Sequence, residues 1–186
     1  MLLLIEPKAF MAKIIGFNKP FGVICQFSGE GDTLANYVNI KAIYPVGRLD
    51  KDSEGLVILT DDGRLQNQMS DPKYKKNKTY IVQVEGEING PAINNLVEGV
   101  DLKDGLTKPA IVKIINQPDW LWNRTPPIRV RKNIPTSWIE ISITEGKNRQ
   151  IRRMTARVGF PTLRLIRVRI DQWSLGSLPL GSYVNL

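Results

Sequence analysis

Short strand-like segments outnumber helical ones along this chain, and few strand–helix–strand units recur. Alternating or continuous apolar residues predict strands over residues 13–17, 57–60, 79–85, 137–144 and 165–170. Apolar residues at helical spacing predict helices over residues 64–69, 91–100 and 148–158. We therefore expect an α+β fold, a mixed and mainly antiparallel sheet with flanking helices, arranged as two lobes around a central cleft.

The composition excludes several kinds of site. The chain contains no histidine, so a Ser-His-Asp triad, a Cys-His pair and a histidine-ligated metal site are impossible. Its single cysteine, Cys25, can form neither an internal disulfide nor a cysteine-rich zinc site. Any catalysis must come from carboxylate, tyrosine, lysine or arginine side chains.

Charge and length point to a compact domain with a polyanionic partner. Lysine and arginine number 26 against 18 acidic residues, a net charge of +8 in 186 residues, which favours nucleic acid first. The apolar start is interrupted at Glu6 and Pro7, too early for a signal peptide or a membrane span. We expect a soluble cytoplasmic protein with a loose tail over residues 1–11 and one folded domain over residues 12–186.

The segment 47–56 places Asp50 two residues after Arg48, in a loop that leads into an apolar strand. Without histidine, an aspartate held by an arginine is the best candidate for a nucleophile or base. Asp52, Asp61 and Asp62 follow within a short distance, and four such acids could instead chelate Mg²⁺ in a nuclease. The sequence Asp61-Asp62-Gly63 is also a good turn by itself.

Two basic segments are candidate RNA contacts. On a helix, Arg149, Arg153 and Arg157 fall in one row, with Lys147 just before it and Arg152 off the row and free to face a cleft. Such like charges repel, so we expect a phosphate-binding surface there rather than a merely solvated face. The proline-rich segment 116–136 interleaves aromatic and basic residues, a pattern that suits RNA binding. The alternative is that its tryptophans pack back on the body of the protein. Its candidates are Trp120, Trp122, Arg124, Arg129, Arg131 and Lys132.

Together these segments resemble the RNA pseudouridine synthases of the ribosomal small-subunit synthase A type. The matching parts, in order, are residues 19–22, 47–56, 78–80 and 145–154. The tryptophan segment and residues 134–138 look closest to the large-subunit, E-type branch of that family. The resemblance covers almost the whole chain from residue 13 onward, so we expect no S4-type RNA-binding domain of the kind that many relatives carry.

The resemblance implies a role for each matching position. Asp50 matches the catalytic aspartate, Tyr80 the tyrosine that stacks on the target base, and Arg152 the basic residue that pairs with the aspartate. Arg48 should help to shape the catalytic loop, and Lys78 shares a strand face with Tyr80. The implied reaction isomerises uridine to pseudouridine in ribosomal RNA, with 23S RNA favoured and with neither metal nor cofactor. We expect a monomer that binds RNA through its catalytic domain; a non-catalytic RNA-binding module is the other alternative.

Overall fold

The computed structural model describes residues 12–129 and 131–186. The strands are β1 (Ile14–Lys19), β2 (Tyr44–Val46), β3 (Glu54–Thr60), β4 (Lys78–Glu85), β5 (Asp101–Leu102), β6 (Gly105–Leu106), β7 (Ile111–Ile115), β8 (Thr136–Ile143), β9 (Thr162–Ile170), β10 (Trp173–Ser174) and β11 (Tyr183–Asn185). The helices are α1 (Gly63–Ser70), α2 (Gly90–Glu98) and α3 (Gln150–Arg157), with 3-10 turns η1 (Leu34–Asn36) and η2 (Pro72–Tyr74).

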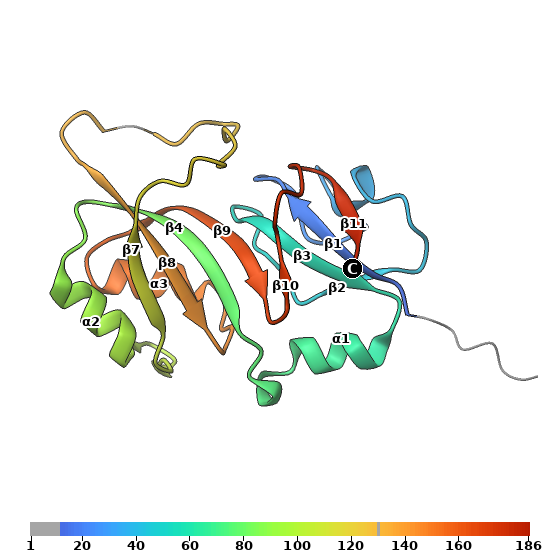
Figure 1. The fold of residues 1–186 in the computed structure, drawn as a ribbon, viewed down its shortest axis with the longest axis horizontal. Coiled ribbons are helices and arrows are strands. Elements are labelled where there is room, and N and C mark those ends of the chain that lie inside the picture. Colours follow the sequence, from blue (N-terminus) through green and yellow to red (C-terminus); the bar gives the residue numbers. More distant parts are fainter. Residues whose placement is uncertain (1–11, 130) are drawn as a thin grey trace, which may run out of the picture.

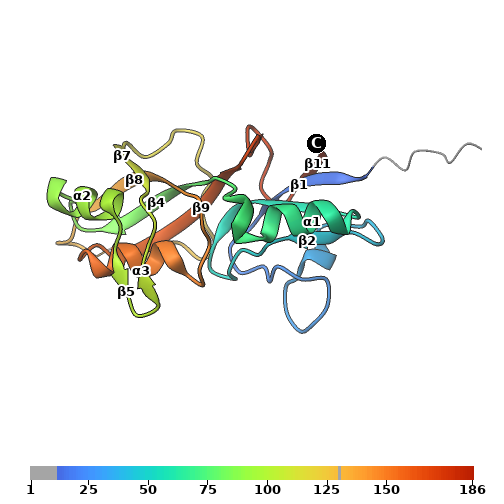
Figure 2. The ribbon, with the colours of Figure 1, turned by 90° about the horizontal axis from the view of Figure 1, so that it is seen from below.

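One sheet runs through the whole molecule in the order β11-β1-β3-β9-β4-β8-β7 (Figure 1). Strands β1, β2, β3 and β11 with α1 form one half, and β4, β7, β8 and β9 with α2 and α3 form the other (Figure 2). Their junction, β3 beside β9, is the parallel pair of an otherwise antiparallel sheet. There Gly55 has a φ of +98°, and a Cβ on it would lie 2.3 Å from the carbonyl oxygen of Arg167, so the junction requires glycine.

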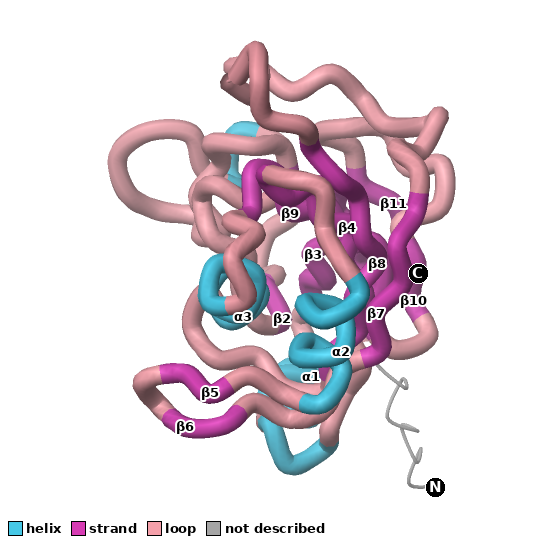
Figure 3. Tube along the Cα trace, turned by 90° about the vertical axis from the view of Figure 1, so that its left-hand side faces the viewer, coloured by secondary structure: helices cyan, strands magenta, loops and turns pink. Residues whose placement is uncertain are grey.

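The two faces of the second half are covered differently. Helices α2 and α3 lie on one face (Figure 3), where Leu96 and Met154 are fully buried in one core cluster with apolar residues of β4 and β8. The segment between β7 and β8 lies against the other face, where Trp122 packs on the cluster of Ile81, Trp138 and Ile166. The helices are thus separated from the long loop by the thickness of the sheet.

The predicted fold class is confirmed, and the predicted strands and helices all form, with shifted ends. Helix α1 begins after Asp62, whose carboxylate accepts from the N–H groups of Arg64 and Leu65. Strands β2, β7, β10 and β11 and the β5–β6 hairpin were not predicted. The expected tail over residues 1–11 lies outside the described residues. In the part of the chain that the structure covers, no helix is long and apolar enough to cross a bilayer.

Candidate active site

A cavity of about 640 Å³ lies at the junction of the two halves. Its wall is formed by the loop between β2 and β3, by β4 and β9, and by the turn that leads into α3. Asp50, Arg48, Tyr80 and Lys78, all expected as site residues, line this cavity, as does Arg149. Segments far apart in the sequence therefore meet at one place.

The loop that carries Asp50 is fixed by backbone hydrogen bonds. The N–H of Ser53 donates to the carbonyl of Asp50 at 3.0 Å, and the N–H of Gly22 donates to the carbonyl of Lys51 at 2.8 Å. Gly47 enters the loop with a φ of +68°, a conformation that glycine adopts without strain. The side chain of Asp50 is 36% exposed, so a ligand in the cavity can reach its carboxylate.

Arg149 is the arginine beside Asp50. Its Nη1 lies 3.5 Å from Oδ2 of Asp50, and its two Nη atoms donate to both carboxylate oxygens of Asp52 at 2.9 and 2.8 Å. These hydrogen bonds hold the pKa of Asp52 below its usual value, although partial burial opposes them. The expectation that Arg48 holds Asp50 is corrected, because Arg48 is exposed and its guanidinium makes no ion pair among the described residues.

Arg152 holds the backbone of the same loop instead of pairing with Asp50. Its Nη2 donates to the carbonyl oxygen of Asp52 at 2.6 Å and lies 3.5 Å from the Asp52 carboxylate. The side chain is only 13% exposed, and burial is the main reason that its pKa lies below the usual value. Arg149, and not Arg152, forms the expected ion pair with Asp50. Arg149 directly precedes α3 with a φ of +49°, and it reaches Asp50 from there.

Tyr80 and Lys78 enter the cavity from β4. They are two residues apart on a regular strand, so both project from the same face. Tyr80 is 7% exposed and offers its ring as part of the cavity wall. Lys78 donates from Nζ to the carbonyl of Lys76 at 3.1 Å, and burial followed by the positive charge of Arg167 lowers its pKa.

The expected row of free arginines is neutralised largely from within the protein. Arg149 binds Asp52, and Arg153 binds the carboxylate of Asp104 in the β5–β6 hairpin at 2.7 and 3.1 Å. Lys147 donates to the carbonyl of Asp104 at 3.2 Å. Arg157, at the end of α3, is exposed. No acid stands among these arginines between residues 149 and 157, which is why the row looked unpaired before folding.

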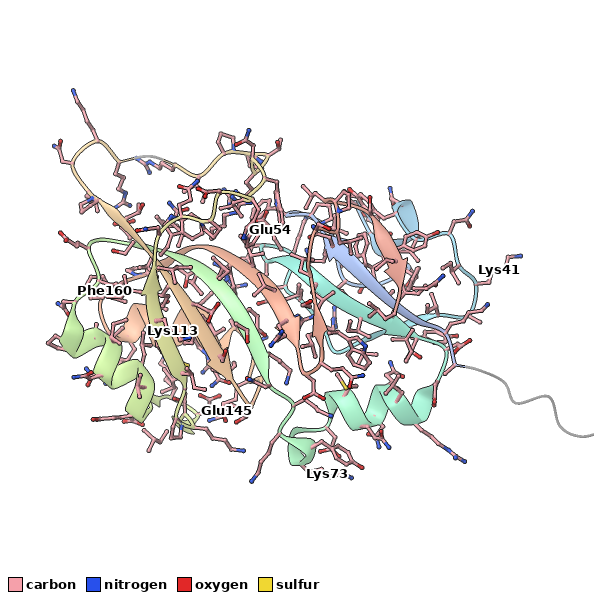
Figure 4. The ribbon with its side chains drawn as sticks, viewed as in Figure 1. Lys41, Glu54, Lys73, Lys113, Glu145 and Phe160 are labelled. Carbon is pink, nitrogen blue, oxygen red and sulfur yellow. The ribbon has the colours of Figure 1, made fainter. Side chains whose placement is uncertain are left out.

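The long loop between β7 and β8 has one anchored and one exposed tryptophan. Trp122 donates from Nε1 to Oε1 of Glu54 at 2.7 Å, so the interpretation that it packs back on the body is correct for this residue. Glu54 lies at the centre of the molecule, directly beneath the loop (Figure 4). Trp120 is 53% exposed, with its ring centroid 6.0 Å from that of Trp122.

The basic residues of this loop divide in the same way. The guanidinium of Arg124 lies 4.2 Å from the ring centroid of Phe21, and Arg131 forms an ion pair with Glu85 at 2.8 Å. Arg129 and Lys132 are exposed. Only part of the predicted aromatic and basic surface is therefore open to a ligand.

The four acids of the alternative nuclease site do not form a metal site. Asp61 accepts from the N–H of Lys13 at 2.8 Å, and Asp62 caps α1. Over the described residues, no group of three or more potential ligands is placed to hold a metal ion. Turn and cap formation accounts for these two acids.

Sequence reasoning missed three residues around the site: Asp104, Arg164 and Arg167. Asp104 lies 49 residues from its partner Arg153, and Arg164 lies 110 residues from its partner Glu54. Arg167 is buried on β9 and lines the cavity. In the sequence, an arginine on an alternating strand indicates only that this face of the strand is exposed to solvent. No local pattern predicted the long-range contacts of these three residues.

Known proteins resemble this chain in both sequence and fold. The sequence pattern of the RNA pseudouridylate synthase family matches residues 13–157. Ribosomal large subunit pseudouridine synthase E of Vibrio parahaemolyticus is 51% identical over 176 residues, which cover 94% of this chain and 74% of that protein. The synthase E of Xanthomonas campestris pv. campestris is 51% identical over 174 residues, which cover 91% of this chain and 93% of that protein. A crystal structure of a pseudouridylate synthase superposes with a TM-score of 0.79 at 28% identity, covering 94% of this chain and 70% of that one.

The fold, the cavity with its aspartate and tyrosine, and these matches define an enzyme that isomerises uridine in RNA. The chain belongs to the RNA pseudouridine synthase family.

Proposed function

We propose that this protein converts a specific uridine of large-subunit 23S ribosomal RNA to pseudouridine, with Asp50 as the catalytic carboxylate and without a cofactor. The main support is the identity of about half of all aligned residues with synthases named for the large ribosomal subunit. The lining of one cavity by Asp50, Tyr80 and Lys78 supports the placement of the reaction.

The reaction breaks the bond between N1 of uracil and C1′ of the ribose, turns the base, and joins its C5 to C1′. The target nucleotide must leave its stack to enter the cavity. The ring of Tyr80 then packs on the base, and the carboxylate of Asp50 faces the ribose. It acts there by attack on C1′ or by removal of a proton from the sugar. Arg152 keeps the loop of Asp50 in place through the carbonyl of Asp52.

RNA contacts outside the cavity come from exposed groups near its mouth and on the long loop. Trp120 offers a stacking surface, and Arg129, Lys132 and Arg157 offer positive charge. Arg124 and Arg131 reach RNA only beside their protein partners Phe21 and Glu85. We place the protein in the cytoplasm, with the ribosomal RNA that it modifies, and expect it to act as a monomer.

The test is a map of pseudouridines in ribosomal RNA from cells that lack this protein. We expect one position or a few positions in 23S RNA to lose pseudouridine and to regain it when the wild-type gene is restored. An unchanged map, or a loss confined to 16S RNA, would contradict the proposal. A gene carrying Asp50→Asn serves as the matched control, because it supplies the folded protein without its carboxylate.

A further inference from the structure

Strand β9 carries two buried arginines, and they differ in how their charge is met. Arg164 is 5% exposed, and its Nε and Nη2 donate to the two carboxylate oxygens of Glu54, each at 2.8 Å. Arg167 is 3% exposed, and its guanidinium makes one hydrogen bond, from Nε to the carbonyl of Leu56 at 2.7 Å. Nη2 of Arg167 is buried with no partner among the described residues.

A buried charge without a counter-charge lowers the stability of the fold by roughly several kcal/mol. It is retained only where another interaction offsets that cost. Arg164 meets this requirement inside the protein and Arg167 does not. Arg167 lies opposite Tyr80 on β4 and lines the cavity that also contains Asp50. Its uncompensated charge therefore lies beside the place where we propose that the substrate binds.

Lys78 adds a second positive charge to the same wall. Its Nζ donates to the backbone carbonyl of Lys76, and within the described residues it forms no ion pair. The charge of Arg167 acts on it, since after burial it is the next cause of the lowered pKa of Lys78. Asp171, the acid whose charge raises the pKa of Lys78, is itself bound by Lys76. Two cations thus line the cavity with Tyr80, and among the described residues neither of them forms an ion pair.

The reaction supplies an anion at this position. When the N1–C1′ bond breaks, its electron pair stays with the uracil ring, whose charge spreads over N1, O2 and O4. C1′ gains an oxygen of Asp50 or becomes part of a double bond after loss of the C2′ proton. C5 of the ring then bonds to C1′, the Asp50 oxygen leaves or the C2′ proton returns, and the C5 proton departs while N1 takes up a proton. Charge that exists only during the reaction is what preorganised donors stabilise best.

We propose that Lys78 is a catalytic residue that donates to a carbonyl oxygen of the detached uracil, and that Arg167 is a positioning residue whose charge strengthens this site. This rests on the proposed function. The alternative occupant, a backbone phosphate, is better served by the exposed Arg129 and Lys132 of the long loop, since phosphates stay with the solvated strand.

The test compares single-turnover rates of N1–C1′ bond cleavage on RNA that contains either uridine or 5-fluorouridine at the target, since a C5 fluorine leaves no C5 proton to depart and the isomerisation itself cannot be completed. Fluorine stabilises the departing ring by itself. We expect Lys78→Met to slow uridine conversion by about 10- to 100-fold, as loss of one such donor does, while RNA affinity changes by less than about threefold. The loss on 5-fluorouridine should be smaller, and Lys78→Arg should recover much of the rate. Lys113→Met, which removes an exposed lysine from β7 (labelled in Figure 4), should change neither rate.

Arg167 is tested by Arg167→Met and Arg167→Lys, each checked for folding by thermal denaturation. We expect Arg167→Met to lower the saturated rate and Arg167→Lys to retain more of it. Equal losses on the two substrates, or a loss of affinity that saturating RNA repairs, would assign Lys78 to a phosphate and overturn the inference. Unchanged rates in Lys78→Met would also overturn it. Failure of the wild-type protein to convert uridine would instead contradict the proposed function.

Discussion

At the scale of single residues, two neighbouring arginines divide the support of the catalytic loop between them. Arg149 lies beside the carboxylates of Asp50 and Asp52, whereas Arg152 holds the carbonyl of Asp52 from a largely buried position. An exposed ion pair is worth little, whereas a charged hydrogen bond in a buried site is worth about 1.5–3 kcal/mol. Arg152 should therefore matter more than Arg149 for the geometry of the loop.

We accordingly expect Arg152→Ala to lower the single-turnover rate at saturating RNA by about 10- to 100-fold, with little change in affinity. Arg149→Ala should have a smaller effect on that rate. The measurement is conversion under single-turnover conditions over a range of enzyme concentrations. If more enzyme restores the rate of Arg152→Ala, this residue binds phosphate and does not hold the loop.

A second prediction at this scale concerns Lys19, which is fully buried in β1. Its Nζ donates to the carbonyls of Pro20 and Val23, each at 2.8 Å, and burial lowers its pKa to about 8. The unfolded chain keeps the proton to a higher pH, so above about pH 8 the unfolded state binds more protons and this group adds stability as the pH rises. The slope is about 1.4 kcal/mol per pH unit while only the unfolded lysine is protonated.

Urea denaturation from neutral pH to about pH 10 measures this effect. We expect the free energy of unfolding of the wild type to gain on the order of 2 kcal/mol relative to Lys19→Met over that range. The variant keeps the buried stem and removes the titrating group, so other titrations cancel in the difference. A difference that stays flat with pH would contradict the assignment.

At the scale of elements, we propose that the long loop between β7 and β8 contacts RNA and is held to the body by a partly buried anchor. Trp122 binds Glu54, whose carboxylate Arg164 also holds, while Trp120 remains open. Trp120→Ala should weaken RNA binding by on the order of 1–3 kcal/mol, leave its salt dependence nearly unchanged and preserve stability. Trp122→Ala should lower the melting temperature as well. Equal effects of the two variants on stability would contradict this division.

The salt dependence of RNA binding separates the exposed cations from the paired ones. Each phosphate contact on single-stranded RNA adds roughly 0.7 to the slope of log affinity against log salt. We expect Arg129→Ala with Lys132→Ala to flatten that slope by about one unit or more. Arg149→Ala with Arg153→Ala should flatten it less, because Asp52 and Asp104 already hold these arginines. A salt titration of RNA binding with both double variants compares the two changes in slope. An equal or larger change in the Arg149 and Arg153 variant would contradict the expectation.

At the scale of the whole molecule, the site exists because two halves of one sheet meet where β3 and β9 run parallel. Much of the fold was predictable, since strand and helix periodicities are local properties of the sequence. Asp50, Tyr80 and Lys78, which line one cavity, could be chosen as candidates because each stands in a short motif. The ion pair of Arg149 with Asp52 spans 97 residues and depends on the tertiary fold, so local patterns could not reveal it. Strand β7, with a mixed pattern of exposure, was missed for lack of alternation.

The central claim is that the Asp50 carboxylate, at the junction of the two halves, carries out the isomerisation. The most direct measurement is tritium release from 5-tritiated uridine in ribosomal RNA, with wild-type protein and with Asp50→Asn, alongside RNA affinity for both. We predict that Asp50→Asn, which keeps size and shape and removes the charge, abolishes release while RNA binding persists. Release by the variant within about tenfold of wild type, a barrier change of only about 1.4 kcal/mol, would contradict the claim.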